Sequence, residues 1–245
     1  MFSGSAKLQT TIFGEFKDII PTPDRVIKLM QIFQDKGFIP GTFLEIESNS
    51  PSPANRISLT TQNSEWLVNI GTQRVDILKN PTNPSGTNLE DINGFIANSI
   101  DIINKLLSNF ERRGNRCALV AEYYYEDSNT LKYDKLYNSL RKPFGIYTKQ
   151  IPFEWNIRDA CKRTISEGEN NEIVNIISML NRMQGQIIGP GVFKSFDRIQ
   201  IIIDINSIPE RYDQRYDIEK VKWFYSRLDK IHNEIAKDID GVINA

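Results

Sequence analysis

The chain has 245 residues, of which 40% are hydrophobic, and its 30 basic and 31 acidic residues give a formal net charge of −1. This length and composition predict a folded protein of one large domain or two packed halves, and they exclude a disordered chain. The charge balance argues against a nucleic-acid binder that works by net charge alone, although a local basic patch remains compatible with it.

Neither a membrane span nor a secretory signal is visible in the chain. There is no run of about 18 apolar residues, and the start Met1–Lys7 lacks a basic segment followed by an apolar one. The two cysteines, Cys117 and Cys161, lie in apolar-rich, strand-like stretches, which predicts buried free thiols in a reducing compartment. We therefore expect a cytoplasmic protein without membrane contact.

The first elements in chain order are a strand and a short helix. The strand is predicted over residues 8–16. The helix begins at Pro23, because Thr22 is a good N-cap and proline is favoured at the first helical position. Gly37 is typical of a left-handed residue after a helix end. These signals predict a β–α start.

Three strands and a long helix follow. Alternating apolar residues predict the strands, and Gly71 marks a bulge or tight turn within the third. In the helix, apolar residues recur at spacings of three and four from Ile92 to Phe110, which is one amphipathic face. These elements cover residues 42–47, 56–61, 66–78 and 88–113.

The second half of the chain repeats a similar order of elements. A strong strand and a helix come first, and an extended segment broken by Pro152 follows. The next segment alternates well enough for a strand, although a helix also fits it, and Gly185–Gly191 is predicted to be a hairpin loop. An isoleucine-rich strand then leads into a final long amphipathic helix. These elements cover residues 117–125, 130–142, 146–165, 172–183, 198–205 and 217–243.

The matching order predicts an α+β protein of two tandem βαβββα halves, residues 1–114 and 115–245. Each half is expected to have a mainly antiparallel sheet covered by its long helix, and the two halves to pack together as one unit. The alternative is one continuous α+β sheet in which the matching order is accidental.

No residue pattern indicates a catalytic centre, a metal site or a cofactor site. His232 is the single histidine and lies on the last helix beside Ile231, where we expect a hydrogen-bonded structural role. Its spacing from Cys117 and Cys161 fits no zinc motif, and a phosphate-binding loop of the GxxxxGK[ST] kind is missing from the sequence. We therefore predict no catalytic residue, no metal and no cofactor.

Three acidic residues define an alternative, a metal-dependent nuclease or another phosphodiester enzyme. Carboxylates near a lysine can hold Mg²⁺ for phosphodiester cleavage. Glu15 and Lys17 have a Glu-x-Lys spacing at a strand end, and Glu45 and Asp204 lie on later strands. In restriction-type nucleases an aspartate comes first and Glu-x-Lys follows it, and this chain reverses that order. Solvated charges on strand faces are the competing interpretation.

A group of aromatic residues with nearby basic residues suggests a binding surface. Tyrosine, tryptophan and arginine dominate protein–protein hot spots, and aromatic and basic groups together also bind single-stranded nucleic acid. Plain packing in the core is the competing interpretation, since adjacent tyrosines on a strand must face opposite sides. The candidate partner or ligand surface consists of Tyr123, Tyr124, Tyr125, Tyr133, Tyr137, Arg141 and Trp155.

The C-terminal half resembles a known family. The residues that carry the resemblance are Ile202-Ile203-Asp204-Ile205 and, after an acidic and Arg-containing loop, Leu228-Asp229-Lys230-Ile231-His232-Asn233. They look like the C-terminal signature of a sporadically distributed, uncharacterised prokaryotic family found on mobile elements and among phage-defence genes. The strand after Arg116 that ends in three tyrosines is similar to a mid-chain strand of that family, although the family's second arginine is absent here. The resemblance implies a genomic context and brings no catalytic residue.

Together these observations predict a non-catalytic cytoplasmic interaction or sensor module, a component of a prokaryotic anti-phage defence system. We expect a protein partner. A nucleic-acid or nucleotide ligand and a homo-oligomer both remain open, and the phosphodiester enzyme built on Glu15, Glu45 and Asp204 is the catalytic alternative.

Overall fold

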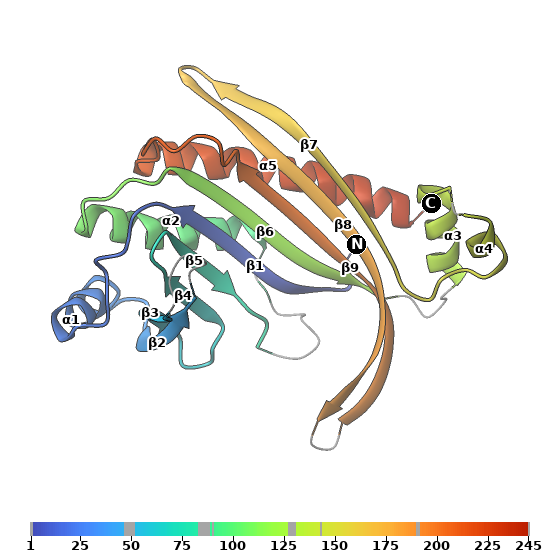
Figure 1. Ribbon diagram of the computed structural model, residues 1–245, viewed down its shortest axis with the longest axis horizontal. Coiled ribbons are helices and arrows are strands. Elements are labelled where there is room, and N and C mark those ends of the chain that lie inside the picture. The colour runs from blue at the N-terminus through green and yellow to red at the C-terminus, as the bar shows by residue number, and fades with distance from the viewer. Residues whose placement is uncertain are drawn as a thin grey trace.

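The protein is seen in a computed structural model that describes residues 2–46, 52–82, 89, 91–126, 131–142, 144–189 and 192–244. Within these residues nine strands form one antiparallel sheet, in the order β2-β3-β4-β5-β1-β6-β9-β8-β7 (Figure 1). The strands are β1 (Gly4–Phe13), β2 (Ile39–Glu45), β3 (Ala54–Thr60), β4 (Trp66–Ile70), β5 (Arg74–Lys79), β6 (Arg116–Tyr125), β7 (Trp155–Glu167), β8 (Asn170–Gly189) and β9 (Val192–Ser207). The helices are α1 (Pro23–Ile32), α2 (Ile92–Asn109), α3 (Leu131–Leu140), α4 (Gly145–Lys149) and α5 (Ile218–Ile243).

The prediction of two tandem βαβββα halves, each with its own sheet, is wrong. Strand β1 pairs with β5 on one side and with β6 on the other, so strands from both sides of residue 114 belong to one sheet. The physical reason is that an unpaired β1 or β6 would leave a row of backbone donors and acceptors at an open edge. The alternative of one continuous sheet is the arrangement that the structure shows. The boundary at residue 114 stays a prediction.

The two long amphipathic helices cover one face of the sheet. Helices α2 and α5 lie behind the strands in Figure 1 and pack on each other and on the central strands. Each begins at an aspartate N-cap: Asp91 accepts from the Gly94 N–H at 2.8 Å and Asp217 from the Lys220 N–H at 3.0 Å. The core lies between these helices and the apolar side of β1, β6 and β9.

A tyrosine of α5 connects the helix layer to the middle of the sheet. The hydroxyl of Tyr225 lies 3.0 Å from the Thr11 carbonyl oxygen on β1 and 3.2 Å from the Ala118 carbonyl oxygen on β6. Tyr225 is fully buried, and burial raises the pKa of its hydroxyl well above the ordinary value. The hydroxyl therefore stays protonated, and its position fixes α5 over the seam between β1 and β6.

The structure tests three predictions that were based on glycine residues, and their outcomes differ. Gly71 lies at the tight turn between β4 and β5, where its N–H donates to the Arg74 carbonyl at 2.9 Å, so the predicted third strand is two strands. Gly37 has a positive φ of 66°, but α1 already ends at Ile32. The predicted loop 185–191 is wrong for residues 185–189, which continue β8; residues 190 and 191 lie outside the described part.

The described helices include none that is long and apolar enough to cross a membrane.

Candidate functional site

The face of the sheet opposite α2 and α5, which we call the open face, is the side turned toward the viewer in Figure 1. Its polar residues form a row from strand to strand, because directly paired residues of neighbouring strands point to the same side. Backbone register places Asn69 opposite Asp76, Asp76 opposite Thr11, and Asn206 opposite Asn175 in this row. The open face therefore presents hydrogen-bonding groups where a core-facing sheet would present apolar ones.

At one end of the open face a phenyl ring stands between two arginines. Phe13 is paired with Arg74 on β5 and with Arg116 on β6, so the three side chains share one level of the sheet. The Arg116 guanidinium carbon lies 4.5 Å from the centre of the Phe13 ring. Arg74 donates from Nε to Asp76 at 2.9 Å, and its side chain is 56% exposed. We call Arg74, Phe13 and Arg116 the Phe13 platform.

A cavity of about 630 Å³ adjoins this platform and belongs to the same open face. Its volume lies within the usual range for small-molecule sites. Phe13 and Phe43 line it with phenyl rings, and the polar side chains along it include Glu45, Asn69, Arg74 and Asp76. Hydrogen bonds orient the Asp76 carboxylate: Thr11 Oγ1 donates to it at 2.7 Å and Gln9 Nε2 at 3.1 Å. The cavity thus combines aromatic walls with both donors and an acceptor.

Arg116 differs from the buried arginines Arg182 and Arg215 in its partners. Arg182 forms ion pairs with Asp134 and Asp197, and Arg215 with Glu172. In the described residues Arg116 has no carboxylate within ion-pair distance; it donates to Asn206 Oδ1 at 3.0 Å, and its Nε has no hydrogen-bond partner. Burial lowers the pKa of the Arg116 guanidinium, which nevertheless stays charged because arginine ionises far above neutral pH. The open face therefore contains a half-buried positive charge with no carboxylate at ion-pair distance among the described residues, although Asp204 and Glu210 attract it from farther away.

The comparisons with known proteins assign no role to this surface. No protein-family model, curated protein or solved structure matches the chain. The family resemblance therefore remains a prediction.

A second arginine–aromatic group lies near the other end of the open face. The Arg198 guanidinium carbon is 3.7 Å from the Tyr124 ring centre and 4.3 Å from the Phe196 ring centre. Unlike Arg116, Arg198 has a carboxylate partner, Glu126, at 3.4 Å. Its charge is therefore partly neutralised within the protein.

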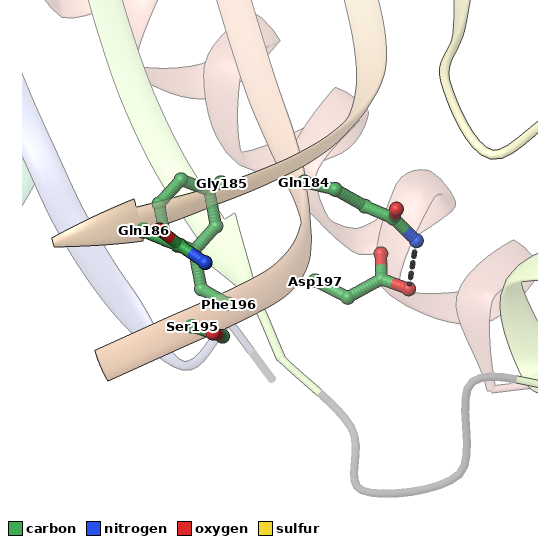
Figure 2. A pocket seen from close by; sticks show the side chains of 6 residues that line it. All are labelled: Gln184, Gly185, Gln186, Ser195, Phe196 and Asp197. Atoms are coloured by element: carbon green, nitrogen blue, oxygen red, sulfur yellow. Dashed lines mark hydrogen bonds between the residues drawn. The ribbon is translucent and has the colours of Figure 1, made fainter. Parts of the chain in front are cut away.

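A further cavity, of about 700 Å³, is lined by residues of the paired strands β8 and β9. Figure 2 shows the side chains that line it. Its carboxylate, Asp197, already accepts from Gln184 at 2.9 Å and from two nitrogens of Arg182. The hydrogen bonds from Arg182 and Gln184 outweigh burial and lower the pKa of Asp197. This carboxylate is thus used to hold the two strands together.

Most of the predicted aromatic surface is buried, and this corrects the prediction that these residues form a binding surface. Tyr123, Tyr125 and Trp155 are each less than a tenth exposed, and Tyr133 and Tyr137 of α3 pack beneath the helix. The alternation predicted for adjacent tyrosines is present: Tyr124 points to the open face, opposite Tyr123 and Tyr125. Of the seven predicted residues, only Tyr124 and Arg141 have substantial exposure.

The exposed hydrophobic residues of this region lie nearby, on α3, α4 and the segment before β7. Sequence reasoning missed them because it weighted the tyrosine cluster. Phe144 and Phe153 are 73% and 65% exposed. Residues 131–153 also contain five basic residues against one acidic residue. We call the following set the apolar cap: Leu131, Leu140, Phe144, Ile146, Tyr147, Ile151 and Phe153.

The three residues of the alternative acidic site do not come together. From Glu45 on β2 to Asp204 on β9 there are six strand steps, which correspond to about 29 Å at the usual strand spacing. Glu15 is exposed in the connection after β1. Within the described residues, no group of three acidic, histidine or cysteine side chains could hold a metal ion.

Glu45 and Asp204 instead have partners within the fold. Glu45 accepts from the backbone N–H and hydroxyl of Thr72 at 2.8 and 2.7 Å, and it lies 3.6 Å from Arg56. Asp204 accepts from Asn206 at 2.9 Å. Glu45 thus connects β2 to the β4–β5 turn, a structural use that accounts for its position.

The structure places His232 and Cys117 in the core. His232 Nε2 lies 2.8 Å from the Tyr123 hydroxyl, and Nδ1 lies 3.2 Å from Asn233 Oδ1. Burial lowers the pKa of His232, so the neutral ring is favoured at pH 7. Cys117 is buried as predicted, whereas Cys161 is exposed, which corrects the prediction for that residue.

A buried ionic cluster connects the start of β8 to the start of α5. The Glu172 side chain is completely buried and accepts from Arg215 Nε at 2.7 Å and Nη2 at 3.2 Å. Lys220 Nζ lies 2.9 Å from the same carboxylate. Arg215 also donates to the Asn115 carbonyl oxygen, so the cluster joins β8, α5 and the chain just before β6.

Proposed function

We propose that the protein is a non-catalytic cytoplasmic interaction module that binds a protein partner through the apolar cap. The observation that carries this proposal is the exposure of seven large hydrophobic side chains within residues 131–153. Soluble proteins seldom expose so many apolar side chains together unless the surface is covered by a partner.

The composition of the cap supports a protein partner. Phe144, Tyr147 and Phe153 are aromatic, and Arg141 lies within the same segment. Aromatic residues and arginine are enriched among the residues that dominate protein–protein binding energies. A second exposed group on α1 and β2, which includes Ile27 and Leu44, is aliphatic and lacks this signature.

The positions of the single histidine and of one of the two cysteines support a non-catalytic role. Cys117 and His232 are buried and engaged with core neighbours. The resemblance of the C-terminal half to a family found among phage-defence genes suggests that the module belongs to such a system, and this context is part of the proposal.

The test is co-purification from cells of the native host, with quantitative mass spectrometry of the bound proteins. The double variant Phe144→Ser/Phe153→Ser should lose a partner that the wild type retains. The matched control, Ile27→Ser/Met30→Ser, changes two exposed residues of α1 and should retain it. Retention of every partner by the cap variant, or a wild type that stays monomeric and without partner, would refute the proposal.

A further inference from the structure

We propose that the open face holds a binding site for a nucleoside phosphate, built on the Phe13 platform and the cavity beside it. The proposal goes beyond the protein-binding role of the apolar cap and rests on different residues. The shared ligand chemistry is a planar base joined to a phosphate, either as a free mononucleotide or as a unit of single-stranded nucleic acid.

The first argument is the unmatched charge of Arg116. This guanidinium is half-buried, and its direct contacts in the described residues are the Asn206 amide oxygen and the Phe13 ring, while Asp204 and Glu210 attract it only from beyond ion-pair distance. Arg74, at the same level, uses only Nε for its contact with Asp76. The two arginines thus provide guanidinium donors on both sides of Phe13, and such donors bind phosphate oxygens in pairs.

The second argument is the shape and lining of the cavity. Its volume of about 630 Å³ is that of a small-molecule site. The rings of Phe13 and Phe43 provide surfaces on which a base can stack, and stacking accepts any base. Asn69 offers both a donor and an acceptor to a base edge, and Asp76 offers an acceptor. Base-binding and phosphate-binding groups therefore lie next to each other.

The third argument concerns the extent of the open face. Arg116 and Tyr124 are eight residues apart on β6, which places the two arginine–aromatic groups about 26 Å apart along the strand. A single-stranded nucleic acid of several nucleotides would reach both groups, whereas a mononucleotide would use the Phe13 platform alone. The two sources of the ligand therefore differ in their dependence on chain length.

The experiment measures binding by the full chain with isothermal titration calorimetry. The probes are the nucleoside monophosphates, inorganic phosphate, and single-stranded oligonucleotides of increasing length. Arg116→Gln should weaken binding roughly tenfold to a hundredfold, since it removes a charge-assisted contact. The matched control is Arg163→Gln, which removes the same charge from a side chain of the edge strand β7 that is 51% exposed and is paired with the buried Val174, on the side of the sheet away from the open face.

Each outcome decides the question. If mononucleotides bind as tightly as the longer oligonucleotides, the ligand is a free nucleotide. If the affinity rises with oligonucleotide length and falls with salt concentration, the ligand is single-stranded nucleic acid. Both support the site, provided that Arg116→Gln weakens binding and keeps the wild-type melting temperature. The proposal is overturned by absence of binding at about 1 mM probe, by equal affinity for inorganic phosphate, or by an equal loss in Arg163→Gln. Because the apolar cap is unchanged in these variants, failure here leaves the partner proposal intact.

Discussion

The buried Glu172 cluster allows a quantitative prediction for the variant Glu172→Gln. The glutamine keeps the size of the side chain and removes its charge. The Arg215 side chain, 7% exposed, and the Lys220 side chain, 19% exposed, would then lose their shared carboxylate. Removing one partner of a buried ion pair costs roughly 3–5 kcal/mol of unfolding free energy, and Asp213, which lies 3.5 Å from Arg215 but is 54% exposed, replaces the lost charge only weakly. For a protein of this size the melting temperature should fall by about 6–20 °C.

Glu172 should also make the free energy of unfolding depend on pH. Burial alone would raise the pKa of Glu172, but the hydrogen bonds from Arg215 and Lys220 outweigh it and hold the pKa below the ordinary value. A carboxyl whose pKa is lowered by folding stabilises the protein above the unfolded-state pKa of about 4.3. That stabilisation is lost as the pH falls through the folded-state pKa. Glu172→Gln should therefore lose less stability between neutral and acid pH than the wild type.

The assay is urea unfolding followed by circular dichroism at several pH values. The control is Glu169→Gln, because Glu169 is exposed in the turn between β7 and β8 and lies close to Glu172 in sequence. The control should change the unfolding free energy by less than about 0.5 kcal/mol. If Glu172→Gln costs less than about 1 kcal/mol, or keeps the wild-type acid dependence, the cluster does not hold β8 to α5 as described.

Three further predictions follow from the buried groups. Burial lowers the pKa of His232, so unfolding should become more favourable as the pH falls below about 6.5. His232→Gln should flatten this slope in pH-dependent melting, and an unchanged slope would contradict it. A Cβ at Gly114 would lie 2.7 Å from Ile12 Cγ1, so Gly114→Ala should cost about 1–3 kcal/mol in urea unfolding; a neutral effect would show that the strands can shift. A thiol reagent should modify the exposed Cys161 in the folded protein and reach Cys117 only after unfolding, because burial raises the pKa of Cys117; equal labelling rates would refute this.

Local patterns in the sequence predicted the long helices well. The final helix was predicted over residues 217–243 and is observed from Ile218 to Ile243, with Asp217 as its N-cap. The reason is that an apolar stripe is a local signal that acts within a few residues. The stripe does not fix the ends of a helix, and the other long helix, predicted over residues 88–113, is observed from Ile92 to Asn109. The pairing of β1 with β6 has no local signal, because Leu8 and Ala121 are joined only through the sheet. This non-local contact decides between one sheet and two.

For the candidate surfaces, too, the sequence predicts features that depend on neighbouring residues and misses those that depend on strand pairing. Alternation correctly separated Tyr124 from its neighbours, but the sequence does not say which side of β6 the helices cover. The Phe13 platform brings together residues 13, 74 and 116, which no motif connects. The exposure of Phe144 could have been suspected from its position between a proline and a glycine, where a regular helix is disfavoured.

The central place of β1 has a consequence for synthesis of the chain. During synthesis β1 is made before both of its partners and has to wait for β5, which ends at Lys79, and for β6, which begins at Arg116. Pairing across such separations slows folding and prolongs the exposure of incomplete edges. A shortened chain that lacks β1 would lose the middle of its sheet. Strands β5 and β6 would then each present a row of backbone N–H and C=O groups without hydrogen-bond partners. Such a product should precipitate or be degraded instead of persisting as a smaller folded form.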